Sequence, residues 1–192
     1  GVYVGNLTTK PMQLWSLPVE QKILYGNLGR ALYERLPLFD AAHLDTFNGV
    51  SFGLCMLEQH DLSRKISEQC LQVCLEAYGE TSTQAAEIYY RLGNNELYRN
   101  NYEEAIDYFN RSIAILETAA PNSERLGYMI KFLCWTRLGW LTDHEETERL
   151  LHRSNEILLA QIPQNPSQIA SQHSAYATVY YLMEQYEKAL GY

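Results

Sequence analysis

The sequence lacks any apolar run that approaches the roughly 20 residues needed to span a bilayer as a helix. Its N-terminal segment, GVYVGNLTTKPMQLW, lacks the basic start and long apolar core of a signal peptide. It also lacks an initiator methionine, so we interpret residue 1 as an internal cut point of a longer protein. These absences predict a protein with no membrane partner.

Positive charge is also scarce, and nowhere is it concentrated. The net charge is −8, with 7 basic and 11 acidic residues in residues 1–96 and 8 and 12 in residues 97–192. A nucleic-acid backbone or an anionic membrane attracts proteins that carry a basic patch. The charge pattern therefore predicts no nucleic-acid partner and favours a basic or apolar one.

Cysteine is too sparse for a disulfide framework, since only four are present among 192 residues. Cys70 and Cys74 lie one helical turn apart on a face that we expect to be buried, where free cysteine packs as a small hydrophobe. A redox or metal role for this pair is the alternative. The pattern favours a reducing, cytoplasmic compartment.

Catalytic motifs are absent as well: there is no G-x-x-x-x-G-K-[ST], no G-x-G-x-x-G and no G-x-S-x-G. The stretch HEETERLLH begins like the zinc-protease motif H-E-x-x-H, but Glu148 takes the place of the second histidine. His144, Glu148 and His152 share a helix face that could hold an adventitious metal, although a solvated charged face is the favoured interpretation. We predict no enzymatic activity, no cofactor and no metal site.

What the sequence does contain is an internal repeat. Y-E-E-A at 102–105 recurs as Y-E-K-A at 186–189. Midway between these two copies stands H-E-E-T at 144–147, and the same interval taken backwards from the first copy leads to H-D-L-S at 60–63. The last residue of each copy is small: Ser63, Ala105, Thr147 and Ala189. The sequence is therefore periodic, with a repeat of about 42 residues.

Each copy begins like an α-helix. Asn101 and Asp143 occupy equivalent positions, and each is followed three residues later by a glutamate, as in a capping box. In the stretch NYEEAIDYFNRSIAIL, residues 101–116, apolar and small residues follow at helical spacing on one face.

A second helical run, residues 85–99, ends two residues before this helix, so the pair is predicted to form a tight antiparallel hairpin. An earlier helix begins near Pro18 and ends near Pro37. Further helices are predicted at about 41–58, 62–78, 83–99, 102–119, 124–141, 144–161 and 167–183.

This pattern resembles the tetratricopeptide repeat. The residues that carry the resemblance are Tyr89, Leu92, Gly93, Tyr102, Ala105, Phe109 and Ser112. Glu96 departs from it where an aromatic residue is expected, and Trp135 replaces the packing glycine. The usual period of the family is 34, and the longer period here resembles the repeats of kinesin light chains and of bacterial regulators.

The resemblance implies an all-α fold, a right-handed α-solenoid of antiparallel helix pairs. We expect an irregular lead-in followed by a helical repeat domain that starts with a partial repeat and stops within a truncated unit. The boundaries are 1–17 for the lead-in, 18–192 for the domain, 18–40 for the partial repeat, and about 41–82, 83–124, 125–166 and 167–192 for the units.

In this family the first helix of each pair lines a concave surface that binds peptides. Carried over by the register of the repeat, the expected partner-binding residues are Asn48, Phe52, Glu87, Tyr90, Asn94, Tyr98, Met129, Phe132, Thr136, Trp140, Ser174 and Thr178. The aromatic residues among them either bind the partner or pack between helices. Because no Lys or Arg is in the set, capture of an acidic C-terminus is disfavoured, and a protein or peptide segment with apolar anchors is the expected partner.

The expected function is that of a recognition or regulatory scaffold in a larger protein. One alternative is a structural solenoid that self-associates through its uncapped C-terminal end. Another is an accessory domain of an enzyme whose catalytic part lies elsewhere. Fold analogy alone supports only the class of function.

Overall fold

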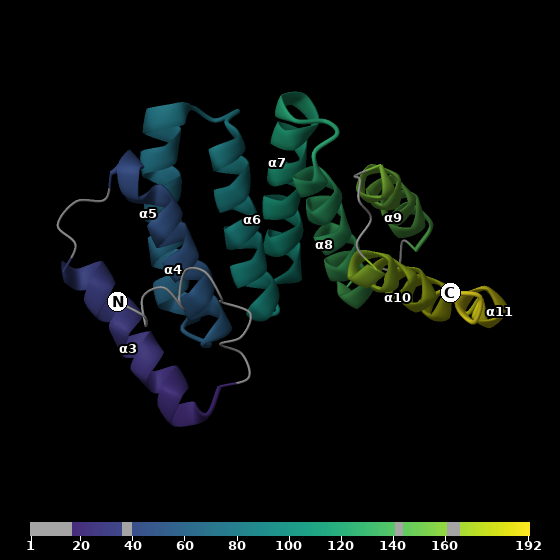
Figure 1. Ribbon diagram of the computed structural model, residues 1–192, viewed down its shortest axis with the longest axis horizontal. Helices are drawn as coiled ribbons and strands as arrows, with labels where there is room; N and C mark the ends of the chain where they lie inside the picture. Colours follow the sequence, from purple (N-terminus) through teal and green to yellow (C-terminus); the bar gives the residue numbers. More distant parts are fainter. Residues whose placement is uncertain (1–16, 36–39, 141–143, 161–165) are drawn as a thin grey trace. The chain divides into compact units, whose positions relative to one another are not determined.

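The computed structural model describes residues 17–35, 40–140, 144–160 and 166–192, and every regular element within these ranges is helical (Figure 1). The elements are α3 (Val19–Arg35), the 3-10 helix η1 (Ala41–His43), α4 (Leu44–Met56), α5 (His60–Tyr78), α6 (Thr83–Tyr98), α7 (Tyr102–Ala119), α8 (Glu124–Trp140), α9 (His144–Leu159), α10 (Pro166–Leu182) and α11 (Tyr186–Ala189). The predicted all-α class and the solenoid of antiparallel helix pairs are confirmed.

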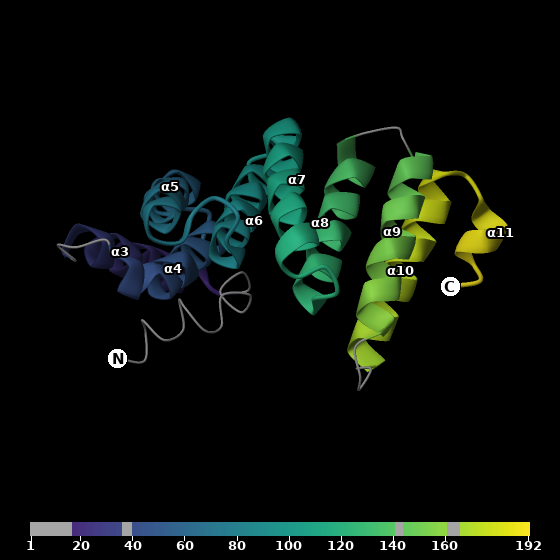
Figure 2. The same ribbon diagram turned by 90° about the horizontal axis from the view of Figure 1, so that it is seen from above.

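Two compact units make up the chain, residues 1–108 and 109–192, with the division inside α7. In the first unit α4 packs against α5, and α6 packs against both (Figure 1). In the second unit α8 packs against α9, α9 against α10, and the short α11 folds back on α10 (Figure 2).

The predicted helices match the observed ones except at some ends. Residues 41–43, predicted as the start of a long helix, form the tighter η1 turn, and the Asp40 carboxylate beside it contacts the His43 ring at 2.6 Å. Helix α5 begins at His60, two residues before its predicted start. Asp143, predicted as a cap, lies outside the described residues. The Asn101 side chain donates to Glu96 at 2.6 Å.

The turn inside each described hairpin repeats with the period of the sequence. The backbone is left-handed at Glu58, Asn100 and Glu184, with φ of 64°, 64° and 58°. The N–H one residue further on donates to a carbonyl five residues back, at 2.9 Å each time: Gln59 to Leu54, Asn101 to Glu96 and Gln185 to Tyr180. This is the Schellman ending of an α-helix, built here without glycine. Its recurrence at one period and again at three periods supports the predicted register.

Small residues allow the helices of a hairpin to approach closely. In the first unit, Ser51 of α4 donates to the carbonyl of Ser63 on α5 at 2.9 Å, and Ser63 donates to the carbonyl of Ser51 at 2.7 Å. In the second unit, Ser154 of α9 donates to the carbonyl of Gly127 on α8 at 2.8 Å. A Cβ added at Gly127 would lie 2.7 Å from the Leu158 side chain, so this approach needs glycine.

The four cysteines are free and buried. Burial raises the pKa of the Cys55, Cys70 and Cys134 thiols to about 12, which suppresses the reactive thiolate. The structure therefore supports the interpretation that Cys70 and Cys74 pack as small hydrophobes.

Candidate functional site

One guanidinium group organises the predicted binding face of the first unit. Arg91 of α6 lies 4.2 Å over the Phe52 ring of α4 and 5.4 Å from the centroid of the neighbouring Tyr90 ring. Its Nη2 lies 2.8 Å from a carboxylate oxygen of Glu87, one helical turn away. The cation–π contact joins α6 to α4, and the ion pair, which lies within α6, holds the guanidinium in position. Three of the predicted residues are thus brought together around Arg91.

Arg91 is the residue that sequence reasoning missed, because it is not among the family's groove positions. The spacing of Glu87 and Arg91, four residues apart on one helix, is a signal that could have found it. Arg91 adds a basic residue beside groove positions that themselves contain no Lys or Arg. Since Glu87 neutralises the charge, the face still offers no uncompensated cation to an acidic C-terminus.

Two asparagine amides border this cluster with unmet hydrogen-bonding capacity. Asn48 of α4 is 7 % exposed and Asn94 of α6 is 2 % exposed. Within the described residues, Asn48 Oδ1 and Asn94 Nδ2 have no hydrogen-bond partner. An unsatisfied buried polar group costs about 1–3 kcal/mol. One free acceptor and one free donor complement the N–H and C=O of a peptide group.

Some of the predicted aromatic residues also support the core. Phe52 and Tyr98 pack against a buried cluster that consists of Tyr25, Cys55, Met56 and Leu57. Both rings remain half-buried, and burial raises the pKa of the Tyr98 phenol. The name α4/α6 surface is used below for Asn48, Phe52, Glu87, Tyr90, Arg91 and Asn94.

In the second unit, two predicted residues of α8 lie in the interior. Met129 is 0 % exposed and Thr136 is 1 % exposed, and the Thr136 hydroxyl donates to the carbonyl of Phe132 at 2.9 Å. Phe132 is half-buried, and its ring centroid lies 6.5 Å from that of Phe109. Met129 and Thr136 therefore lie in the interior of this unit. The side chain of Trp140 lies outside the described residues.

The last two predicted residues, Ser174 and Thr178, line an open apolar groove between α10 and α11. Its lining, called the α10/α11 groove below, comprises Ser174, Ala177, Thr178, Tyr181, Tyr186, Ala189 and Leu190. Tyr181 is 63 % exposed and Leu190 is 88 % exposed. Large exposed apolar side chains in one place mark an interaction surface.

Comparison with known proteins finds a family model that matches part of the chain. Residues 40–118 match the family model described as tetratricopeptide repeat. Residues 40–118 are tetratricopeptide repeats. The predicted resemblance is thereby confirmed. A search of curated protein sequences finds no match.

Solved structures share the tetratricopeptide fold over most of the chain. BtubC (BKLC) from P. vanneervenii is 17 % identical with a TM-score of 0.72, and the match covers 94 % of this chain and 78 % of that one. The nearly identical TPR-like repeats of a putative kinesin light chain from Podosopora anserina are 15 % identical with a TM-score of 0.66, covering 90 % and 81 %. A further crystal structure of the same repeats gives 15 %, 0.67, 90 % and 80 %. At this identity the likeness concerns the fold.

The histidine face considered for a metal packs against the tyrosines of α10. The Tyr180 hydroxyl donates to Glu148 at 2.5 Å, and the Tyr176 hydroxyl lies 3.0 Å from His152 Nδ1. Glu148 and His152 therefore join two helices and do not form a wholly solvated face, which corrects the favoured interpretation. Among the described residues, no group of three or more His, Cys, Asp or Glu could hold a metal.

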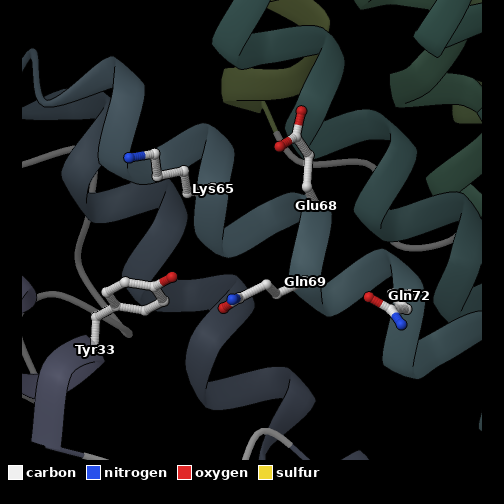
Figure 3. A pocket seen from close by; sticks show the side chains of 5 residues that line it. All are labelled: Tyr33, Lys65, Glu68, Gln69 and Gln72. Atoms are coloured by element: carbon white, nitrogen blue, oxygen red, sulfur yellow. The ribbon is translucent and has the colours of Figure 1, made fainter.

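A further hollow between α3 and α5 is polar. Figure 3 shows the side chains that line it: Tyr33, Lys65, Glu68, Gln69 and Gln72. None is a predicted site residue, and Glu68 is already paired with Arg64 at 2.9 Å. We assign no role to this hollow.

Within the described ranges, no helix is both long and apolar enough to cross a bilayer.

Proposed function

We propose that the α4/α6 surface binds an extended polypeptide segment that carries apolar anchor side chains. Tetratricopeptide repeats generally serve as protein-interaction scaffolds, and this surface contains five of the residues predicted for that role. The observation that carries the proposal is the pair of unsatisfied amides, Asn48 Oδ1 and Asn94 Nδ2, beside the Phe52–Arg91 contact. A bound backbone supplies the donor and the acceptor that these amides lack.

Binding then has two components. Anchor side chains of the partner pack against the exposed parts of Phe52 and Tyr98, where apolar area is removed from water. The two amides turn outward from their buried positions and bond to the partner's backbone, which satisfies the polar atoms that have no partner inside the chain. Because Arg91 is paired with Glu87, its charge is already neutralised and offers little to a carboxylate of the partner. The surface therefore favours partners that bind through apolar side chains.

In this proposal the chain acts by recognition, without catalysis, as the regulatory or scaffold part of a larger protein. We further propose a cytoplasmic location, which the four free, buried cysteines support. Neither a nucleic acid nor a membrane is proposed as partner, since the net charge is −8 with no basic concentration.

Selection from a displayed library of random peptides tests the proposal without knowledge of the natural partner. The enriched peptides are synthesised, and their dissociation constants are measured for wild type and for Phe52→Ala and Asn94→Ala. We expect each substitution to weaken binding about tenfold or more, as for residues at the centre of an interface. The matched control is Tyr78→Ala, which removes a 48 % exposed aromatic ring from α5.

The control variant is expected to bind like wild type, and thermal unfolding establishes that all variants are folded. Enriched peptides that bind Phe52→Ala and Asn94→Ala as tightly as wild type would place the binding site elsewhere. Failure to enrich any peptide would contradict the proposal.

A further inference from the structure

Very little of the two amides of the α4/α6 surface meets solvent in the free chain. Asn94 is 2 % exposed and Asn48 is 7 % exposed. Even so, Asn94 Nδ2 and Asn48 Oδ1 have no hydrogen-bond partner in the part of the chain that the structure describes. A neighbouring side chain has to move before the backbone of a partner can bond to both amides.

Arg91 is the long side chain that crosses from one helix to the other between these amides. On α6 it lies one helical turn before Asn94, and on α4 the ring that it contacts, Phe52, lies one turn after Asn48. The guanidinium carbon is 4.2 Å from the centroid of the Phe52 ring. Arg91 therefore covers one face of the ring against which an apolar anchor of the partner packs.

Two features make this contact easy to open. The Nε–H of Arg91 is buried and lacks a hydrogen-bond acceptor among the described residues, and an unsatisfied buried donor destabilises the conformation that buries it. The ion pair of Arg91 with Glu87, at 2.8 Å, lies within α6, so it can persist when the guanidinium leaves Phe52. Opening thus breaks the cation–π contact, keeps the ion pair and gives the Nε–H access to water.

We propose that the Phe52–Arg91 contact is autoinhibitory: it closes the α4/α6 surface in the free chain, and the partner displaces Arg91 from the Phe52 ring. The inference rests on the peptide binding proposed above and adds a regulation of that same surface. The apparent affinity of a partner is reduced by the fraction of molecules in which the surface is open. A segment with a weak apolar anchor is therefore excluded, and a segment with a strong one is retained.

Substitution of Arg91 tests the proposal through the direction of the effect. Dissociation constants are measured for the peptides that the wild-type chain enriches from the displayed library. Arg91→Gln removes the group that covers the ring, so we expect about fivefold tighter binding. Arg91→Lys keeps the charge but lacks the planar group that stacks on a ring, so the gain should be smaller. Arg30→Gln removes the same charge from an exposed position on α3 and should bind like wild type.

Nuclear magnetic resonance follows the contact in the wild-type chain itself. The Nε–H signal of Arg91 is assigned by its absence from the spectrum of Arg91→Lys. A proton held near the face of an aromatic ring resonates upfield, and this displacement should disappear when an enriched peptide is added. An upfield signal that persists in the saturated complex would overturn the proposal, because Arg91 would then remain on Phe52.

The two proposals fail in different ways. If folded Arg91→Gln binds the enriched peptides no more tightly than wild type, the contact is not autoinhibitory, although peptide binding itself stands. If the wild-type chain enriches no peptide, both proposals are overturned. Thermal unfolding establishes that each variant is folded. Should Arg91→Gln fail to fold, the affinity of Arg91→Lys and the wild-type Nε–H signal decide the question.

Discussion

The same junction between neighbouring repeats is built with different chemistry in the two units. In the first unit, Arg64 of α5 and the buried Glu96 of α6 form an ion pair at 2.9 Å, and Asn101 donates to the same carboxylate. In the second unit, two periods further along, Glu148 of α9 accepts a hydrogen bond from Tyr180 of α10 at 2.5 Å. The carboxylate lies on the first helix of a pair in the first unit and on the second helix of a pair in the second unit. The two positions are in contact in both units.

This difference shows that the repeat register determines which two positions meet at the junction. The side chains at these positions can differ between repeats, provided that they are complementary to each other. It also explains the departure at Glu96, where the family has an aromatic residue. A buried carboxylate is tolerated there because Arg64 and Asn101 satisfy it. Tyr180 restores the aromatic residue at the equivalent position, and Glu148 accepts a hydrogen bond from its hydroxyl.

The largest effect is expected from Glu96→Leu. The substitution leaves Arg64 and Asn101 without the carboxylate that they share, and breaking a buried ion pair is strongly destabilising. Because the Arg64 side chain is 32 % exposed, we expect a loss of about 2–4 kcal/mol in the free energy of unfolding, measured in urea. Glu104→Leu removes an exposed carboxylate 3.6 Å from the same guanidinium and should change stability little. Equal effects of the two substitutions would show that Glu96 is not the centre of the junction.

A smaller effect is expected from Tyr180→Phe. This change removes one hydrogen bond to a carboxylate and leaves the ring in place, so we expect a loss of about 1–2 kcal/mol in the free energy of unfolding. Tyr181→Phe, at a 63 % exposed neighbour, serves as the control and should be neutral. A Tyr180→Phe variant as stable as wild type would mean that ring packing alone maintains this junction.

The second junction should also respond to alkaline pH. Donation to Glu148, together with burial, raises the pKa of Tyr180 above its ordinary value of 10.0. Since the folded chain retains this proton where the unfolded chain loses it, the stabilisation is complete below pH 10 and is lost as the pH rises further. Burial raises the pKa of Tyr176 in the same unit to about 12, with the same sign.

Urea unfolding measured between about pH 8 and 11 tests this expectation. The stability of wild type should fall with rising pH more steeply than that of Tyr180→Phe. Parallel profiles for the two proteins would contradict the role assigned to the Tyr180 proton.

The smallest effect, and a gain, is expected from Glu184→Gly. Glu184 has φ of 58°, a left-handed backbone that disfavours side chains and suits glycine. We expect a gain of about 0.5–1 kcal/mol, measured by thermal unfolding. Glu187→Gly, inside the α11 helix, should instead destabilise the chain. A loss at both positions would show that the turn is not strained.

Local patterns in the sequence determined the period of the repeat, the helices, the tight hairpins and the family. Helical spacing, small residues and turn positions act over short stretches and recur, so one sequence contains several independent copies of the same signal. The predicted set on α4 and α6 followed from that register.

Tertiary structure alone decided which of the predicted residues are accessible. In the folded chain Met129 and Thr136 are buried, Arg91 lies over the Phe52 ring, and Glu148 accepts a hydrogen bond from Tyr180. These outcomes depend on side chains from helices far apart in the sequence, where burial and partner are set by what packs opposite. A periodic pattern specifies the face of a helix, but the neighbour that covers that face is present only in the folded chain.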